Sequence, residues 1–324
     1  MNTLLETQLK RAKVAARLLK NMPTCTKNQA LDKIADALIA HSEEIIEANK
    51  KDMAHAKEVN MTKAMQDRLL FTHERIVGVS DGVKKVATLP DPIGEVMESW
   101  TRPNGLEISK VRVPIGVFGI IYEARPNVTV DIASLCLKSG NACVLRGGKE
   151  AIHTNKKLVE IMKDATKDIL PEGAIELITE LDHAIVGELI RANEYVDVIV
   201  PRGGAGLIQF VVKNATVPVI ETGAGICHLY VDKDADLNKA LTIAVNAKIQ
   251  RPSVCNAIET ILVHKDVADK FLPELKKAFE KVEIKGDDAT CQIINCEHVT
   301  DDSYATEYDD YIVNIRVVDS VEEA

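Results

Sequence analysis

Ile115-Gly116-Val117-Phe118-Gly119-Ile120-Ile121-Tyr122-Glu123-Ala124-Arg125-Pro126-Asn127 runs from an apolar segment into a polar turn. The run from Val117 to Tyr122 does not alternate between apolar and polar residues, which is typical of a strand buried on both faces. Similar runs recur between amphipathic helical stretches such as Ile152 to Lys167 and Ala184 to Asn193. They are Ala142 to Leu145, Ile175 to Ile178, Val196 to Val200 and Val217 to Ile220. This repeat of strand, turn and helix predicts an α/β fold with a parallel, Rossmann-type sheet wrapped by helices.

Ligands of such folds bind beyond the carboxyl ends of the strands, so the turns at those ends are candidate binding sites. They are Glu123 to Asn127, Arg146 to Glu150, Pro201 to Gly206 and Glu221 to Gly225. The turn Pro201-Arg202-Gly203-Gly204-Ala205-Gly206 opens a helix, so its backbone N–H groups and the helix dipole can face a phosphate. Its spacing is not Gly-x-Gly-x-x-Gly, and a plain tight turn is the alternative. Arg146-Gly147-Gly148-Lys149 carries two cations, which suit a nucleotide ribose or phosphate, with ordinary turn chemistry as the alternative.

The residues before this α/β region predict helices and then a hairpin. In the segment from Thr26 to Lys51, apolar residues share one helical face and charged residues the other. From Glu98 to Pro114, two strands flank a Pro-Asn-Gly turn, and the second strand alternates strictly, which predicts one polar face. An isolated hairpin is marginal in water, so we expect residues 98–114 to lean on another domain or subunit.

A second α/β segment follows Gly225. Its predicted strands are Cys227 to Val231 and Glu259 to His264, and its predicted helices are Asp236 to Lys248 and Val267 to Val282. We therefore predict two domains. Residues 1–225 hold the N-terminal helices and the cofactor-binding sheet, and residues 226–324 form the catalytic domain.

Cys255 is the candidate nucleophile. It lies in Gln250-Arg251-Pro252-Ser253-Val254-Cys255-Asn256, a polar turn between a helical segment and an apolar strand. A thiol on such a turn can reach a substrate, whereas a thiol inside a strand cannot. A small buried residue at a corner of the fold is the alternative for this position.

Composition excludes several classes of protein. The chain has 324 residues, 46% of them apolar, and no run approaches the roughly 18 apolar residues that span a bilayer. The N-terminus does not resemble a signal peptide, and seven cysteines without a repeated spacing argue against a disulfide framework, so we expect a cytoplasmic protein. A net charge of -9 and 4% aromatic residues disfavour nucleic acid as a partner. Cys227-His228 and the Cys291/Cys296 spacing lack the pattern of a zinc site, so we predict no metal and core packing for these cysteines.

Five linked motifs carry a resemblance that runs in order along nearly the whole chain. They are Glu123-Ala124-Arg125-Pro126-Asn127-Val128-Thr129-Val130-Asp131, Lys138-Ser139-Gly140-Asn141-Ala142, Arg146-Gly147-Gly148-Lys149-Glu150, Pro201-Arg202-Gly203-Gly204-Ala205-Gly206, and Asn246-Ala247-Lys248 leading to Gln250-Arg251-Pro252-Ser253-Val254-Cys255-Asn256. Together they resemble the γ-glutamyl phosphate reductase family, which is a member of the aldehyde dehydrogenase superfamily. The resemblance implies an aldehyde dehydrogenase-like fold, with a cofactor domain, a catalytic domain and a β-hairpin for oligomerisation.

The same resemblance implies an activity. It is the NADPH-dependent reduction of L-glutamyl 5-phosphate to L-glutamate 5-semialdehyde with release of phosphate, a step of proline biosynthesis. Cys255 would attack the acyl phosphate and form a thioester, and hydride transfer to that thioester would give the aldehyde. The side chain of Asn127 and the backbone N–H of Cys255 would stabilise the oxyanion. For Asn127, capping of the following helix is the alternative.

The resemblance also implies binding roles. Arg146 and the loop Arg202, Gly203, Gly204 and Gly206 match positions that hold the cofactor's adenosine ribose and pyrophosphate. Preference for NADPH requires a cation near the 2′-phosphate, for which Lys149 and Arg146 are the candidates. Arg125 and Arg251 would meet the substrate's carboxylate or acyl phosphate, because guanidinium groups suit both anions.

Glu221 matches the glutamate with which hydrolytic aldehyde dehydrogenases activate water. A reductase does not use that water, so Glu221 either assists Cys255 or the nicotinamide, or is structural. Three interpretations stay open: a phosphorylating reductase, a hydrolytic aldehyde dehydrogenase, and a non-catalytic binding module. Members of the family continue beyond the position of Ala324, so we expect the catalytic domain to be incomplete at its C-terminus and the full-length enzyme to be a homo-oligomer.

Overall fold

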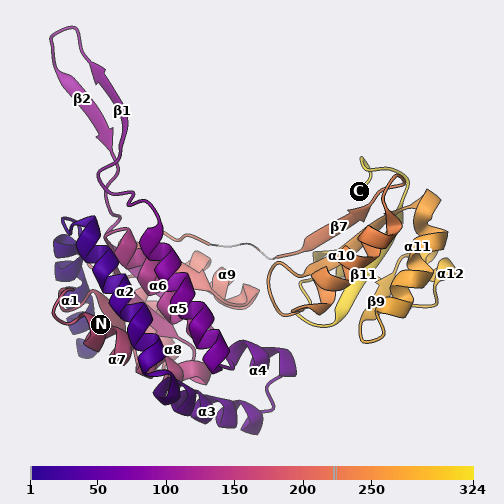
Figure 1. Cartoon of the computed structure of the whole chain (residues 1–324), viewed down its shortest axis with the longest axis horizontal. Coiled ribbons are helices and arrows are strands. Elements are labelled where there is room, and N and C mark those ends of the chain that lie inside the picture. The colour runs from indigo at the N-terminus through magenta and orange to yellow at the C-terminus, as the bar shows by residue number, and fades with distance from the viewer. Residues whose placement is uncertain (1, 222, 224) are drawn as a thin grey trace. The chain divides into compact units, whose positions relative to one another are not determined.

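The computed structural model describes residues 2–221, 223 and 225–324. The chain divides into two compact units, Met1–Thr222 and Gly223–Ala324, called unit 1 and unit 2 below (Figure 1). Each unit has its own cluster of buried apolar side chains. Thr222 and Ala224, which fall in the predicted turn from Glu221 to Gly225, lie outside the described residues.

Unit 1 is built around a parallel sheet in the order β5-β4-β3-β6. Its strands are β3 (Val117–Tyr122), β4 (Ala142–Gly147), β5 (Ile175–Leu177) and β6 (Val198–Arg202). Nearly every residue of β3 and β4 is buried, as the non-alternating apolar runs predict. The prediction of a strand from Val217 to Ile220 is wrong: this segment makes an isolated bridge from Val219 to Ile199. Pro218 has no N–H to donate to a continuing ladder.

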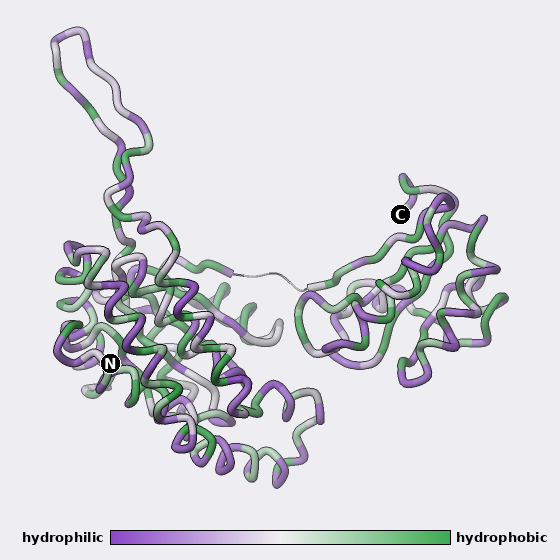
Figure 2. The backbone as a smooth tube through the Cα atoms, viewed as in Figure 1, coloured by the Kyte–Doolittle hydropathy of each residue, from purple (hydrophilic) through white to green (hydrophobic). Residues whose placement is uncertain are grey.

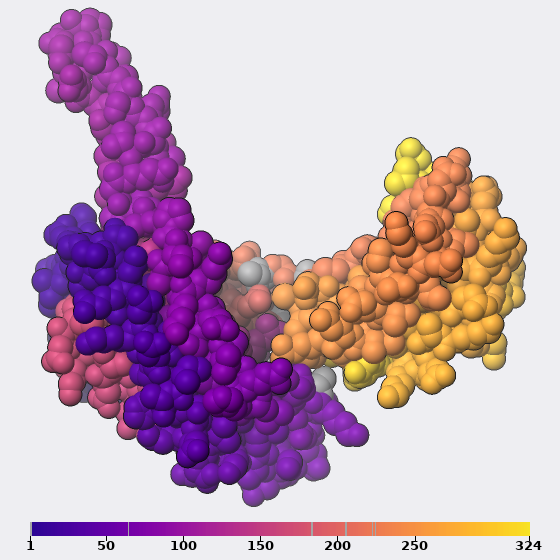
Figure 3. All heavy atoms as spheres, in the orientation of Figure 1, coloured from indigo at the N-terminus to yellow at the C-terminus, as the bar shows by residue number. Residues whose placement is uncertain are grey.

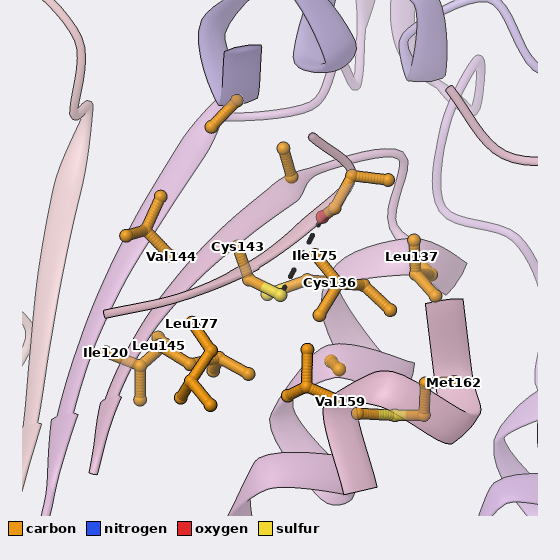
Figure 4. Packing of buried hydrophobic residues seen from close by; sticks show 14 of the residues in the cluster. Ile120, Cys136, Leu137, Cys143, Val144, Leu145, Val159, Met162, Ile175 and Leu177 are labelled. Atoms are coloured by element: carbon orange, nitrogen blue, oxygen red, sulfur yellow. Dashed lines mark hydrogen bonds between the residues drawn. The ribbon is translucent and has the colours of Figure 1, made fainter. Parts of the chain in front are cut away.

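Helices surround this sheet. They are α1 (Thr3–Leu19), α2 (Thr24–Ala40), α3 (Ser42–Glu58), α4 (Lys63–Leu69), α5 (His73–Thr88), α6 (Pro126–Lys138), α7 (Ile152–Thr166), α8 (His183–Leu189) and α9 (Ala205–Asn214), with a 3₁₀ turn at Lys149–Ala151. Helices α1, α6, α7 and α9 contact its strands, and α2, α3 and α5 pack on α6 and α7 as an outer layer. Apolar and polar residues alternate along the helices with helical spacing (Figure 2). Between the sheet and α6 and α7, buried side chains such as Leu145, Leu137 and Met162 fill the core (Figure 4).

The predicted hairpin is present as β1 (Val96–Thr101) and β2 (Glu107–Val111), which pair antiparallel. It projects from the body of unit 1 (Figures 1 and 3). The alternation predicted one polar face, but every residue of β1 is exposed, and β2 is exposed except for the half-buried Ile108. No described residue of unit 1 covers either face of the ribbon, so Met97 and Trp100 are 50% and 40% exposed.

Unit 2 contains a second parallel sheet in the order β10-β9-β11-β8-β7. The strands are β7 (Cys227–Val231), β8 (Ile258–His264), β9 (Glu283–Gly286), β10 (Glu297–His298) and β11 (Ile312–Val318), and the helices are α10 (Leu237–Ile249), α11 (Lys265–Ala278) and α12 (Asp288–Ile293). Phe271 and Leu272 of α11 are buried against this sheet. Every helix in the described part of the chain is too short or too polar to cross a bilayer.

Candidate active site

The sheet of unit 1 brings three of the predicted turns to one edge. The chain passes from β3 through β4 to β5 on one side and then returns to place β6 on the other side of β3. The turns after β3 and β6 therefore flank a topological switch point, where α/β folds bind ligands. The Glu123 N–H donates to the carbonyl oxygen of Arg202 at 3.1 Å, and the Gly148 N–H donates to the carbonyl oxygen of Tyr122 at 2.8 Å.

Glu123 occupies the beginning of helix α9. Its Oε2 accepts a hydrogen bond of 3.0 Å from the N–H of Gly204, the residue that precedes the helix. Gly203 makes room for this carboxylate, because an ideal Cβ on Gly203 would lie 2.5 Å from the same oxygen. The turn that the sequence assigned to a phosphate thus already binds an anion from the chain itself, which shows that its geometry suits one. The sequence motif contains Glu123 but does not indicate its role. The one available signal is the position of an acidic residue directly after a strand at the switch point.

Asn127 lies in the first turn of α6 and does not cap it. The residue at the cap position is Arg125, which makes no side-chain cap hydrogen bond. Instead, Asn127 Nδ2 donates to Asp131 Oδ2 at 2.9 Å. Burial raises the pKa of Asp131, and the hydrogen bond from Asn127 opposes that rise. Because an amide nitrogen carries two hydrogens, Asn127 keeps a second donor.

The backbone just before Asn127 is held in an unusual conformation. Ala124 has a φ of +41°, a region that residues with a Cβ rarely adopt. Its N–H donates to Glu150 Oε1, so a carboxylate from the turn after β4 holds the turn after β3. Glu150 is a second acidic residue whose role the sequence motif does not indicate.

The two candidate cations of the turn after β4 differ in their surroundings. Arg146 is 7% exposed, and its Nη2 donates to the carbonyl oxygen of Leu181 at 3.2 Å. Its buried Nε has no hydrogen-bond partner among the described residues. Burial lowers the pKa of Arg146, while the charges of Glu150 and Glu123 act in the opposite direction. Lys149, by contrast, is exposed in the 3₁₀ turn.

These features of unit 1 fit a cofactor that carries phosphates. A buried, unpartnered guanidinium nitrogen, an exposed ammonium and the N–H groups at the beginning of α9 lie at the same edge of the sheet. Arg202 is half-buried at the end of β6, and Gly203, Gly204 and Gly206 are exposed in the turn after it. A cavity of about 260 Å³ at the opposite end of β5, lined by Lys163, Leu170 and Gly173, has no part in this edge.

Cys255 lies in unit 2, on the loop between α10 and β8, and its side chain is exposed, as predicted. Neighbouring Pro252 and Ser253 are buried and anchor the loop. The Cys227 thiol donates to the carbonyl oxygen of Cys255 at 3.4 Å. An ideal Cβ on Gly225 would lie 2.5 Å from that oxygen and 3.2 Å from Cys255 Cβ. The loop that carries Cys255 is therefore packed directly against residues 225–227, a contact that no sequence motif indicated.

The structure groups the candidate residues within each unit. Asn127, Arg125, Arg146, Lys149 and the glycines after Arg202 are in unit 1, and Cys255 and the exposed Arg251 are in unit 2. Glu221, in unit 1, is exposed. Among the described residues, no group of three His, Cys, Asp or Glu side chains is arranged to hold a metal ion. The pairing of Asn127 with Cys255 stays a prediction.

Comparison with known proteins gives one consistent result. The model of the aldehyde dehydrogenase family matches residues 3–303. Gamma-glutamyl phosphate reductase of Moorella thermoacetica is 55% identical over 330 aligned residues, covering 100% of this chain and 79% of the relative. The crystal structure of gamma-glutamyl phosphate reductase from Thermotoga maritima matches with a TM-score of 0.88 at 45% identity, over 98% of this chain and 78% of that one. The enzyme of the same name from Saccharomyces cerevisiae matches with a TM-score of 0.65 at 32% identity, over 99% and 82%.

Proposed function

Because the chain belongs to the aldehyde dehydrogenase family and aligns over its whole length with gamma-glutamyl phosphate reductases, we propose that it reduces L-glutamyl 5-phosphate to L-glutamate 5-semialdehyde and releases phosphate. This is an oxidoreductase reaction of proline biosynthesis. The observation that carries the proposal is the identity of 55% across 100% of the chain, which includes the exposed cysteine loop.

The chemistry begins at Cys255. Its thiolate attacks the carbonyl carbon of the acyl phosphate, the C–O bond to phosphate breaks, and a thioester remains on Sγ. A bound nicotinamide cofactor supplies the hydride for reduction. The resulting thiohemiacetal releases the aldehyde when its C–S bond breaks and the thiolate is regenerated.

Asn127 stabilises the oxyanion that forms in both steps. Its contact with Asp131 fixes the side-chain amide and leaves one N–H for the substrate oxygen. Loss of one such donor costs about 3 to 4 kcal/mol of transition-state stabilisation. Arg125 and Arg251 bind the carboxylate and the acyl phosphate of the substrate.

The cofactor is NADPH, and Lys149 is the cation that meets its 2′-phosphate. The buried position of Arg146 and its hydrogen bond to Leu181 fit contact with the adenosine ribose better than contact with a solvated phosphate. The loop from Arg202 to Gly206 holds the pyrophosphate at the beginning of α9. The hairpin of residues 98–114 exposes apolar side chains on both faces and serves oligomerisation, and the enzyme works in the cytoplasm.

A reverse assay tests the activity. Glutamate semialdehyde, in equilibrium with its cyclic pyrroline form, is supplied with NADP, and NADPH is followed with and without inorganic phosphate. A phosphorylating reductase requires phosphate, because the thioester is released by phosphate attack. Turnover that ignores phosphate would indicate a hydrolytic aldehyde dehydrogenase. Cys255→Ser separates catalysis from binding: it abolishes turnover and leaves NADPH binding intact, whereas loss of folding would assign Cys255 a structural role.

A further inference from the structure

Unit 2 contains a pair of thiols that the proposed reaction does not use. Cys291 Sγ lies 2.9 Å from Cys296 Sγ, and both side chains are half-buried. Cys291 belongs to α12, and Cys296 directly precedes β10. The sequence predicted core packing for both cysteines, but both residues are partly exposed to solvent.

The fold brings the two sulfurs together by a local return of the chain. Helix α12 ends at Ile293, Ile294 is extended, and β10 then pairs with β9. Gly286, at the end of β9, provides the space: an ideal Cβ on Gly286 would lie 2.7 Å from Cys296 Sγ. Cys291 Sγ in turn lies 3.5 Å from the carbonyl oxygen of Gly286.

We propose that Cys291 and Cys296 are a redox modification site that closes to an intramolecular disulfide and reopens in reducing conditions. A disulfide has an S–S length of about 2.05 Å, so the sulfurs must approach by less than about 1 Å. The site is independent of the proposed reductase activity, because it involves neither Cys255 nor the sheet edge of unit 1.

The oxidant is a low-molecular-weight disulfide such as oxidised glutathione. One thiolate attacks a glutathione sulfur, the glutathione S–S bond breaks, and a mixed disulfide and one glutathione thiol form. The second protein thiol loses its proton and attacks the mixed disulfide, which releases the second glutathione thiol. The protein loses two electrons and two protons, and the glutathione disulfide gains them. Burial and the neighbouring Cys291 sulfur raise the pKa of Cys296 to about 12, which disfavours Cys296 as the thiolate that attacks first.

A second pair of cysteines provides an internal control. Cys136 and Cys143 lie near each other in the apolar core of unit 1, and the Cys143 thiol donates to the carbonyl oxygen of Ala174 at 3.8 Å (Figure 4). Their exposed fractions are 4% and 0%. Its contact with Cys136 raises the pKa of the Cys143 thiol, and burial raises it further. These thiols should stay reduced while the folded protein is treated with glutathione disulfide.

The test uses the full chain and peptide mass mapping. The folded protein is incubated with oxidised glutathione and then unfolded in denaturant that contains the alkylating reagent, so that every remaining thiol is alkylated. The protein is then digested with trypsin. Lys285 and Arg316 bracket a stretch with no other Lys or Arg, so residues 286–316 form one peptide that contains both thiols and no other cysteine. We expect this peptide to lose the mass of two hydrogen atoms and to carry neither alkyl group nor glutathione. Treatment with a phosphine before alkylation should restore two alkyl groups.

Variants and controls decide the interpretation. In Cys291→Ser, the peptide of residues 286–316 should never lose two hydrogens. The peptides of Cys136 and Cys143 should remain alkylated, and the exposed Cys25 should carry a glutathione, which shows that the oxidant was active. If Cys25 is modified while both thiols of the 286–316 peptide remain alkylated or each carries its own glutathione, the proposal is wrong.

Discussion

The Lys248 ammonium lies 2.8 Å from Glu259 Oε2, and both side chains are buried. Lys248 is on α10 and Glu259 is on β8, so the ion pair joins the two ends of the loop that carries Cys255. Burial raises the pKa of Glu259, although the hydrogen bond and charge of Lys248 act against the rise. The pair therefore anchors the loop that carries Cys255, at the cost of desolvating two charges.

Removal of one partner of the Lys248–Glu259 ion pair should lower the stability of unit 2 more than removal of both partners. Lys248→Met leaves a buried carboxylate without its counter-charge, and we expect unit 2 to lose about 3 to 5 kcal/mol of stability. The double variant Lys248→Met/Glu259→Leu should lose clearly less, because no charge stays buried. Urea unfolding of both variants measures the difference. A double variant as unstable as the single one would contradict this account.

Gly225→Ala should displace the loop that carries Cys255, the proposed nucleophile. The added Cβ would lie 2.5 Å from the carbonyl oxygen of Cys255, a distance that Cβ atoms in proteins essentially never show, so the loop must move. A displacement of about 1 Å at a reacting group can cost on the order of 100-fold in rate, and we expect kcat to fall by at least tenfold. Gly223→Ala is the matched control, because its Cβ meets no atom within 4 Å. Equal losses in both variants would assign the effect to chain stiffness rather than to the contact.

Local patterns predicted the strands of unit 1 well because their apolar runs are short and unbroken, as β3 illustrates. They failed from Val217 to Ile220, where the composition resembles a strand but Pro218 prevents a full ladder. The contacts of the site were harder to predict. Glu123 meets Gly204 and Glu150 meets Ala124 across turns that are distant in sequence. Periodicity describes one element at a time and cannot reveal which side chain crosses between two turns.

Asp131 should make stability depend on pH. Its folded-state pKa is raised above the ordinary 3.8 by burial, so the stability it contributes is complete below about pH 3.8 and is lost as pH rises through the folded pKa. Asp131→Asn lacks this titration and still offers an acceptor oxygen to Asn127. The free energy of unfolding of the variant, relative to the natural chain, should therefore rise with pH from 3.8 upward and then level off. A difference that is constant with pH would show that the carboxyl group has the same pKa in both states.

Lys149→Ala should change the choice of cofactor. The exposed ammonium is the proposed partner of the 2′-phosphate, and the loss of one such charge-assisted contact, about 1.5 kcal/mol, corresponds to a roughly tenfold higher Kd for NADPH. NADH lacks this phosphate, so its Kd should not change. Lys156→Ala, which removes another exposed ammonium, on α7, controls for general charge effects. If the affinities for NADPH and NADH fall together, Lys149 contacts a part of the molecule that the two cofactors have in common.

Glu123→Gln should strengthen cofactor binding. The Glu123 carboxylate accepts the Gly204 N–H and so places a negative charge at the beginning of α9, where the proposed function puts the pyrophosphate. Glutamine keeps an acceptor for that N–H but removes the charge. We expect the Kd for NADPH to fall roughly fivefold at low ionic strength, about 1 kcal/mol, because two anions no longer compete for one helix N-terminus.

Salt and a matched control make this prediction specific. The increase in NADPH affinity of Glu123→Gln should become smaller as ionic strength rises, since exposed charges are screened. Glu194→Gln removes an exposed carboxylate just before the amino end of β6, at the opposite edge of the sheet, and should leave the Kd unchanged. Weaker NADPH binding in Glu123→Gln would overturn the argument, because it would make the carboxylate itself a ligand, accepting hydrogen bonds from hydroxyl groups of the cofactor. The direction of the change in Kd therefore decides whether Glu123 is a competitor of the phosphates or a partner of the ribose.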